Sequence, residues 1–445
     1  MKNKLKILII THYFPPSNSI ASHRTYSWAK YWSKMGHDVT VLTTAKERRE
    51  NDLNLPFDGF QVIEIENTFY TRLKKYLGQK QELIYQKTIG SKEKSKSLKF
   101  LFINQVNAIA KKRGIFFTAR MPDFTDAWYF NVVKNFTFKS YDVVVSSAGP
   151  YIVHLLGLRF KKRGLIKFCV ADYRDLWTQN HIFPGLFPFT IIEEFLEKKV
   201  NKTSDLITTV SEPLARKIID KYTISNVEVI YNGFDDEILE NLDPKPFWVD
   251  SKIRIVYAGT IYTGFQDPTP LFKAIKEVEN SEYRNLLKNL ELIFVGSSKG
   301  NLDLIVENFQ VYNYVKYLGF VKHEDSLRMQ RDAHLLLFLE FKSENQDGIL
   351  TGKLFEYLFS GTQIWAIGID ENTSAGRLIK ESNCGICFGE NVERIKSSLI
   401  QLLTIGKKPA INPNSEILDR YSRKKQAEKL INLILEKYNY KQNDE

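Results

Sequence analysis

A lysine and a glutamate three residues apart, Lys353 and Glu356, are the pair in this sequence best suited to ligand chemistry. The pattern of residues 351–359 predicts a helix that carries both side chains on one face. The first amides of a helix have no intrahelical partner and the macrodipole adds positive charge, so a phosphate can bind beside Lys353. Glu356, one turn later, would accept hydrogen bonds from ribose hydroxyls. The pair therefore predicts a nucleotide diphosphate site.

The elements that must position this pair form two α/β halves. In the first half, strands are predicted at 6–14, 37–44, 60–65, 141–147, 167–171, 206–210 and 226–231, with a helix at 24–35. The second half restarts after a linker and has predicted strands at 253–258, 290–295, 314–318, 335–339 and 363–367 and helices at 325–331, 351–359 and 422–437. Repeated βα units predict parallel sheets with ligands at the carboxyl ends of the strands.

Composition sets wider bounds. The chain has 445 residues with 43% apolar content, which favours two domains. Its cysteines, Cys169, Cys384 and Cys387, include one C-x-x-C without a second pair at zinc spacing, so we interpret them as packing residues in a reducing compartment and predict no metal site. No stretch approaches the ~20 apolar residues of a membrane span, and residues 7–10 are too short for a signal peptide. We expect a cytoplasmic protein, either free or on the inner face of the plasma membrane.

The net charge of +11 is concentrated in one segment, residues 70–120. Thirteen Lys or Arg side chains stand there against Glu82 and Glu93, so the rest of the chain is neutral on balance. Aromatic residues are interleaved with the cations, a pattern that suits an anionic membrane surface. A solvated insertion explains the same pattern. Nothing else in the sequence resembles a nucleic-acid-binding module, and no nucleic-acid partner is expected.

Several short motifs follow one another in a recognisable order. They are HYFPP, GHDVTVLTT, ADYRDLW, ITTVSEPLA, VIYNGFD, IVYAGTIY, FVG, YLGFV and GKLFEYLFSG. In order and approximate spacing they resemble the glycosyltransferase 4 family of GT-B fold glycosyltransferases, over nearly the whole chain except the basic insertion. The DYRDLW and KLFEYL elements resemble a bacterial branch that builds surface polysaccharides, including the O-antigens of lipopolysaccharide.

The resemblance implies a GT-B fold, with two Rossmann-like parallel-sheet domains facing across a cleft. The implied domains are 1–240 on the acceptor side with the insertion at about 70–120, a linker at 241–252, and 253–421 for nucleotide-sugar binding. A C-terminal helix and tail at 422–445 can pack back on the N-terminal domain. The resemblance further implies a retaining hexosyl- or N-acetylhexosaminyltransferase that uses a UDP- or GDP-sugar and needs no other cofactor. Its acceptor would be a glycan or a polyprenyl-diphosphate-linked saccharide.

The family motifs also assign site residues to positions in this sequence. Catalytic roles are expected for Lys353, Asp172, Arg174 and Asp175. Donor contacts are expected from Glu356, Gly348, Ile349, Leu350, Thr351, Asp347, Gly259 and Thr260, and contacts lining the cleft from His23, Arg24 and Gly149. The family's first glutamate would fall on Gly348, with Asp347 beside it, and its usual basic residue after the strand at 253–258 is absent. Lys353 is therefore expected to be the main cation at the leaving diphosphate.

Each candidate has a structural alternative. Lys353 and Glu356 could be solvated helix residues, and Asp347 could serve a loop turn. An arginine between two aspartates, as in Asp172, Arg174 and Asp175, is also a common ion-pair cluster. The spacing of GILTGK excludes a Walker A loop, and no dinucleotide-binding G-x-G-x-x-G follows the first strand. A sugar-nucleotide epimerase with the GT-B fold and a degenerate nucleotide-sugar-binding protein remain alternatives to the transferase.

Overall fold

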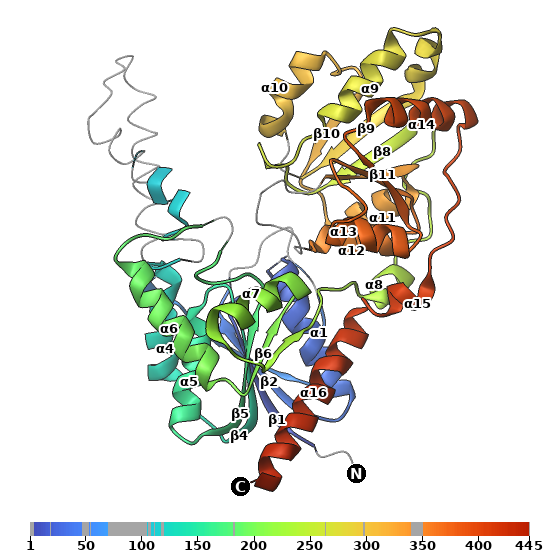
Figure 1. The fold of residues 1–445 in the computed structure, drawn as a ribbon. Helices are drawn as coiled ribbons and strands as arrows, with labels where there is room; N and C mark the ends of the chain where they lie inside the picture. Colours follow the sequence, from blue (N-terminus) through green and yellow to red (C-terminus); the bar gives the residue numbers. More distant parts are fainter. Residues whose placement is uncertain are drawn as a thin grey trace, which may run out of the picture. The chain divides into compact units, whose positions relative to one another are not determined.

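The computed structural model describes residues 4–17, 19–46, 53, 55–69, 105, 108–110, 112–116, 120–180, 183–262, 264–296, 299–339 and 350–444. The chain divides into two compact units (Figure 1). Unit 1 comprises Met1–Ile230 and Ala427–Glu445, and unit 2 comprises Tyr231–Gln426. The chain therefore enters unit 2 once and returns to unit 1 at its C-terminal end. The linker predicted at 241–252 lies within unit 2.

Unit 1 is built on a parallel sheet of seven strands in the order β3-β2-β1-β4-β5-β6-β7. The strands are β1 Lys6–Thr11, β2 Asp38–Thr44, β3 Gln61–Ile65, β4 Tyr141–Ser147, β5 Ile166–Tyr173, β6 Leu206–Thr209 and β7 Val227–Val229. The central strands are continuous apolar runs, as expected for strands that are covered on both faces. All strands run the same way, so their carboxyl ends lie at one edge of the sheet.

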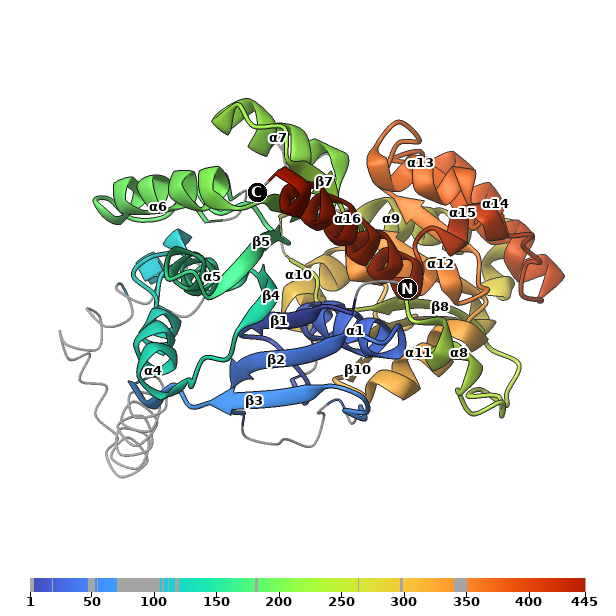
Figure 2. The ribbon, with the colours of Figure 1, turned by 90° about the horizontal axis from the view of Figure 1, so that it is seen from below.

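Helices cover both faces of this sheet. They are α1 Ile20–Lys34, η1 Phe124–Ala127, α4 Trp128–Asn135, α5 Ile152–Lys162, α6 Phe189–Thr203, α7 Glu212–Tyr222 and the end of α16 Arg423–Asp444. α1 and α16 share one core with the sheet, and the Trp32 indole N–H donates to the Ala427 carbonyl at 2.9 Å. The opposite face is covered by α4, α5, α6 and α7, of which α4, α5 and α6 lie in a row (Figures 1 and 2).

Unit 2 contains a second parallel sheet, of six strands in the order β10-β9-β8-β11-β12-β13. The strands are β8 Ile253–Ala258, β9 Leu290–Val295, β10 Val315–Gly319, β11 Leu335–Leu339, β12 Ile364–Ile367 and β13 Gly385–Gly389. The helices are α8 Asp236–Glu240, α9 Thr269–Glu279, η2 Glu282–Asn289, α10 Lys299–Phe309, α11 His323–Asp332, α12 Gly352–Phe359, α13 Ser374–Glu381, α14 Val392–Ile405 and α15 Ser415–Asp419. One core joins the sheet to α9, η2 and α14, and the other joins it to α11, α12 and α13.

The two parallel sheets confirm the predicted α/β class. The strands expected at 141–147, 253–258, 290–295 and 335–339 have the predicted bounds. The helix expected at 351–359 begins at Gly352, with Thr351 as its N-cap. Cys384 and Cys387 are buried free thiols, in keeping with a packing role. Among the elements without a predicted counterpart are α13, β13 and α14; β13 has only five residues with glycine at both ends, so it shows no long apolar run. Among the described helices, none is long and apolar enough to cross a membrane.

Candidate functional site

Lys353 lies in the first turn of α12 and points toward the carboxyl end of β8. Its ammonium lies 3.7 Å from the centroid of the Tyr257 ring and donates a hydrogen bond to the Tyr257 hydroxyl. Gly259, the residue after β8, makes this placement possible: a Cβ there would lie 2.9 Å from Cε of Lys353, and its φ of +128° is one that side chains rarely adopt. The absence of a side chain at position 259 therefore gives Lys353 its place beside the strand.

The ammonium of Lys353 is held in a poorly solvated position. Burial lowers its pKa to about 7, although the nearby Glu356 carboxylate acts in the opposite direction. No carboxylate of the described residues forms an ion pair with Lys353 within 4.0 Å. An ammonium that is costly to keep charged because it is poorly solvated gains most from a neighbouring anion. Lys353 is therefore a poorly solvated cation at the N-terminus of α12, and its position suits the binding of an anion.

Glu356 is fixed by two side chains of α11. His323 Nε2 lies 3.2 Å from one carboxylate oxygen, and the Gln330 amide donates to the other at 3.3 Å. Burial raises the pKa of Glu356, but the contacts with His323 and Gln330 and the charge of Arg423 outweigh this effect and leave the pKa below its usual value. Glu356 retains 26% of its side-chain exposure. It is thus an oriented, ionised carboxylate with accessible surface one turn from Lys353.

Glycines end three neighbouring strands of the same sheet edge. Gly259, Gly296 and Gly319 follow or end β8, β9 and β10, and all have positive φ. Gly296 approaches the Gly259 carbonyl so closely that a Cβ at position 296 would lie 2.8 Å from that oxygen. The space that side chains would fill at Gly259 and Gly296 is taken by Lys353 and by the Gly259 carbonyl, so these glycines allow close packing at the strand ends. The nearby Thr351 hydroxyl is buried and has no hydrogen-bond partner in the described structure.

The remaining residues predicted to contact the donor differ in burial, and some of them lie outside the described residues. Leu350 is 6% exposed and packs in the core beneath α12, so only its backbone is suited to ligand contact. The Thr260 carbonyl accepts a hydrogen bond from the Tyr257 hydroxyl at 3.0 Å. Asp347, Gly348 and Ile349 lie outside the described residues.

In unit 1, Asp172 forms a buried ion pair with Arg24. The guanidinium donates two hydrogen bonds, at 2.7 and 3.1 Å, and the Ser147 and Thr208 hydroxyls donate at 2.7 Å each. Asp172 is fully buried and Arg24 is 4% exposed. Burial raises the pKa of Asp172, but Arg24 and the two hydroxyls outweigh it and hold the pKa low. Asp172 therefore ties α1 to the ends of three strands, and its oxygens are already occupied.

The neighbouring candidates differ in exposure. Arg174 is partly buried and donates to the Ala148 carbonyl, and it lies so close to Gly149 that a Cβ there would be 2.2 Å from its Nη2. Asp175 is exposed, and its backbone carbonyl accepts from the Tyr151 hydroxyl. His23 is 6% exposed on α1, immediately before Arg24. The predicted cluster therefore separates into a structural pair, Arg24 and Asp172, and a more open group around Arg174.

Sequence reasoning missed two residues of this open group, His12 and Lys46, which follow β1 and β2. Burial and the charges of Lys46 and Arg174 lower the pKa of His12 to about 3, so its imidazole is neutral at pH 7. Its Nδ1 is buried and has no partner among the described residues. Burial lowers the pKa of Lys46 to about 8. Their positions after consecutive parallel strands are the signal that could have identified them.

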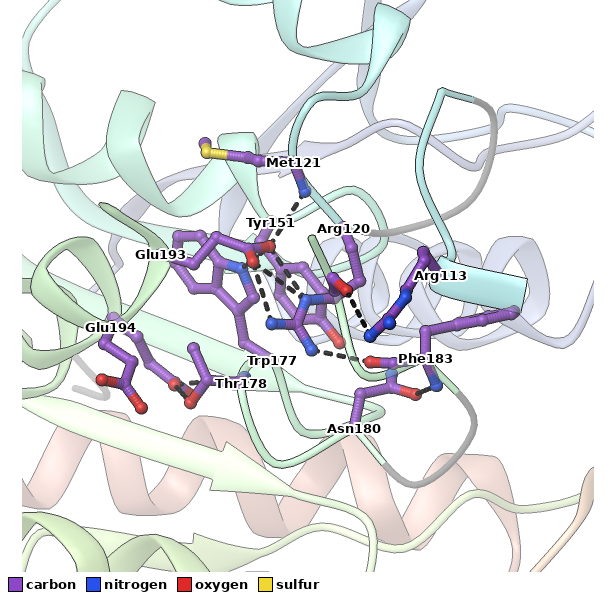
Figure 3. A network of polar contacts seen from close by, with 12 residues as sticks. Arg113, Arg120, Met121, Tyr151, Trp177, Thr178, Asn180, Phe183, Glu193 and Glu194 are labelled. Atoms are coloured by element: carbon purple, nitrogen blue, oxygen red, sulfur yellow. Dashed lines mark hydrogen bonds and ion pairs between the residues drawn. The ribbon is translucent and has the colours of Figure 1, made fainter. Parts of the chain in front are cut away.

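A second buried ion pair in unit 1 joins Arg120 to Glu193 of α6 (Figure 3). Arg120 is 1% exposed and donates to both oxygens of Glu193, and it also donates to the Phe183 carbonyl at 2.7 Å. Glu193 further accepts from the Met121 amide and the Trp177 indole. Arg120 is one of the cations of the basic segment at 70–120, but it is an internal residue that anchors the end of that segment to α6. Most of residues 70–119 lie outside the described structure.

Comparison with known proteins supports the resemblance drawn from the motifs. Residues 91–238 match the sequence model of Glycosyltransferase Family 4. The match begins at residue 91, inside the basic insertion. A search of curated proteins found none that matches the chain.

Solved structures share the fold across the whole chain. A glycosyltransferase from Rickettsia africae is 13% identical, with a TM-score of 0.58 and 100% of each chain covered. TarM of S. aureus, solved as a mutant with UDP, is 11% identical with a TM-score of 0.53, covering 96% of this chain and 99% of that one. UDP-GlcNAc 2-epimerase from Methanocaldococcus jannaschii is 13% identical with a TM-score of 0.50, covering 97% and 99%. At these identities the likeness shows the fold alone, and the similar structures include a glycosyltransferase and an epimerase.

Proposed function

We propose that this chain, which has the GT-B fold and whose residues 91–238 match the model of Glycosyltransferase Family 4, is a retaining, metal-independent glycosyltransferase. It moves a sugar from a nucleotide sugar held by unit 2 to an acceptor held by unit 1. One observation carries the assignment of the donor site to unit 2. Lys353 and Glu356 stand one turn apart at the start of α12, at the strand end where Gly259 gives the Lys353 side chain its place.

The donor nucleotide meets complementary chemistry at this place. The ionised Glu356 carboxylate accepts hydrogen bonds from the two ribose hydroxyls, and the contacts from His323 and Gln330 hold it in position to do so. The diphosphate binds to Lys353 and to the free amides at the N-terminus of α12. Gly259 and Thr260 line the same strand end. In this proposal Asp347, Gly348 and Ile349, which precede α12, contact the donor sugar and phosphate.

The chemical step breaks the bond between the anomeric carbon and the diphosphate. Negative charge grows on the departing diphosphate, and Lys353 with the helix amides stabilises it as it forms. These groups supply the positive charge that the leaving group needs, so the proposal includes no metal ion. Retention follows if the acceptor hydroxyl attacks the same face that the diphosphate leaves, with a diphosphate oxygen taking the hydroxyl proton. No side chain forms a covalent intermediate in this scheme.

On unit 1, the open group around Arg174 is the proposed acceptor site. His12 is neutral at pH 7 and lies near Lys46 and Arg174, and these two cations attract an acceptor phosphate. Asp175 is exposed and is a further hydrogen-bond acceptor for sugar hydroxyls. Asp172 and Arg24 act through the fold, by fixing the strand ends on which these residues stand. A phosphate-bearing acceptor fits the proposed polyprenyl-diphosphate-linked saccharide and a role in surface polysaccharide or O-antigen synthesis.

A screen of nucleotides and nucleotide sugars by thermal shift tests the donor assignment. A ligand at 100 times its Kd adds about 2.7 kcal/mol to folded-state stability, so a true donor raises the melting temperature measurably. UDP- and GDP-sugars of the hexose and N-acetylhexosamine types are the expected hits. If none of them shifts the melt, unit 2 does not bind a nucleotide sugar under these conditions and the proposal fails.

The reaction is then resolved by product analysis with the donor that binds. A transferase forms a glycosylated product only when acceptor is present. An epimerase interconverts the donor sugar without any acceptor, and a degenerate binding protein leaves the donor unchanged in both mixtures. Either of the last two outcomes would replace the transferase assignment, although the fold and the donor site would stand.

A further inference from the structure

A groove of about 340 Å³ lies on the outside of unit 1, between α4, α5 and α6. Its cationic side chains are Arg159, Lys162, Arg163 and Lys199. Apolar side chains, among them Leu158 and Leu196, form the rest of its surface together with Tyr129. None of the lining residues is acidic. A groove with an apolar surface and four cations is complementary to a molecule with an anionic head and an apolar body.

The cations of this groove have no anionic partner in the described structure. None of the four takes part in an ion pair with a described carboxylate, and Nε of Arg159 is buried without a hydrogen-bond partner. Lys162 and Lys199 are close neighbours, and the charge and hydrogen bonding of Lys199 lower the pKa of Lys162. The acidic residues of α6 have partners outside the groove: Glu193 binds Arg120, Glu197 accepts from Thr178 and Tyr222, and the exposed Glu194 lies 3.7 Å from the Lys221 ammonium. Four positively charged side chains therefore line this groove, and none of them is paired with a described carboxylate.

Exposed apolar side chains on α6, with Phe187 just before the helix, form a stripe that continues from the groove. Phe187, Ile191, Ile192 and Phe195 are 74%, 59%, 47% and 65% exposed. Helical spacing places Ile192, Phe195 and Lys199 along one face, and the Lys199 ammonium lies 5.9 Å from the centroid of the Phe195 ring. Phe130 on α4, the helix at the far side of the groove, is 71% exposed. Large apolar side chains beside unpaired cations are the composition of a helix that lies at a lipid–water interface.

We propose that the α4–α6 face of unit 1 docks on an anionic lipid bilayer, with lipid phosphates in the groove lined by Arg159, Lys162, Arg163 and Lys199 and with Phe195, Ile191 and Ile192 in the acyl boundary. The argument rests on charge complementarity and on the continuity of the stripe with the groove. It does not depend on the proposed sugar transfer, because donor binding is assigned to unit 2. It also names a surface distinct from the basic residues 70–119, most of which lie outside the described structure.

The test is cosedimentation of the full chain with vesicles of phosphatidylcholine alone or with 30% phosphatidylglycerol. The parent protein should bind the anionic vesicles more tightly, and added salt should weaken the binding. Each basic residue near such a surface contributes about 1 kcal/mol, so the double variant K162E/K199E should lose about 30-fold or more in vesicle affinity. Phe195→Ser should lose about tenfold, because burial of a phenylalanine in the interface is lost.

Matched control variants show whether vesicle binding depends on this face or only on the net charge and exposed apolar surface of the protein. K288E/K407E reverses two exposed lysines of unit 2, and Leu304→Ser removes an exposed apolar side chain of α10, so each should retain vesicle affinity within about threefold. Every variant should keep the parent's thermal melt and nucleotide affinity. Groove and stripe variants that bind vesicles as their controls do would overturn the proposal and assign the binding to residues outside this face. Equal binding of the parent to neutral and anionic vesicles, or to neither, would overturn it as well. If K162E/K199E does not fold, Phe195→Ser alone decides.

Discussion

The protonation of Lys353 gives the proposed donor site a pH signature that can be predicted from the structure. In the empty site burial lowers the pKa of Lys353 to about 7, from an ordinary value of 10.5. A bound diphosphate adjacent to the ammonium restores the charged form and raises the pKa again. Donor binding therefore takes up a proton wherever the free lysine is neutral. Affinity must then fall as the pH rises above 7, because the proton has to be taken from solution.

The size of this effect follows from the two protonation states. If the bound lysine stays charged throughout, the apparent affinity falls about tenfold for each pH unit well above the free pKa. Between pH 6.0 and pH 8.5 the total loss is about 30-fold. Lys353→Met keeps the length of the side chain over the Tyr257 ring but removes the charge, so its affinity should be weaker at pH 6 and nearly independent of pH.

Isothermal titration calorimetry across this pH range, in several buffers of different ionisation enthalpy, measures both the affinity and the proton uptake. A nucleotide sugar is the right ligand, because its diphosphate has no terminal phosphate that titrates near pH 6. His323→Gln serves as a control for a histidine contribution, and it should retain the slope. A flat profile in the parent, or the same slope in Lys353→Met, would show that Lys353 does not bind the diphosphate.

Three further predictions concern the donor site and the fold. Glu356→Gln removes a charge-assisted hydrogen-bond acceptor worth roughly 1.5–3 kcal/mol, so donor affinity should fall about 10- to 150-fold with little change in the thermal melt; unaltered affinity would exclude ribose binding by this residue. Turnover should survive EDTA, because Lys353 and the α12 amides supply the positive charge; loss of turnover that manganese or magnesium restores would contradict this. Burial, with the charges of Asp123 and Glu193, raises the pKa of Asp126 to about 7, above its unfolded value of 3.8, so folded-state stability falls as pH rises from about 4 to 7. Asp126→Asn should therefore melt higher than the parent at pH 8 but not at pH 4, and an equal difference at both pH values would refute the assignment.

The sequence predicts the parts of this structure that depend on local pattern. Continuous apolar runs identify the buried strands, and the helix of Lys353 and Glu356 begins within one residue of its predicted start. Its orientation toward β8 depends on Gly259, which is distant in sequence, so no local pattern could show that Lys353 lies over Tyr257.

The role of a charged residue cannot be predicted from local sequence when its partner is distant along the chain. Asp172 finds its partner Arg24 148 positions away, and Arg120 pairs with Glu193 across 73 positions. From sequence alone, Asp172 was expected to act in catalysis, and Arg120 was counted among the cations that could bind a membrane surface. In the fold both side chains form buried ion pairs. His12 stands in the HYFPP motif, but its neutrality arises from burial and from two cations distant in sequence, so no local pattern marked it as a site residue.

The central claim, that unit 2 binds a nucleotide sugar through Lys353 and Glu356, is tested most directly by one calorimetric comparison at pH 7. The ligand is titrated into the parent, into the isosteric double variant K353M/E356Q, and into K380M/E371Q, which makes the same chemical changes in an exposed ion pair of unit 2. We predict that the parent and K380M/E371Q bind alike and that K353M/E356Q binds at least about 100-fold more weakly while melting as a folded protein. Equal affinity of all three proteins would contradict the account and place the donor site away from α12.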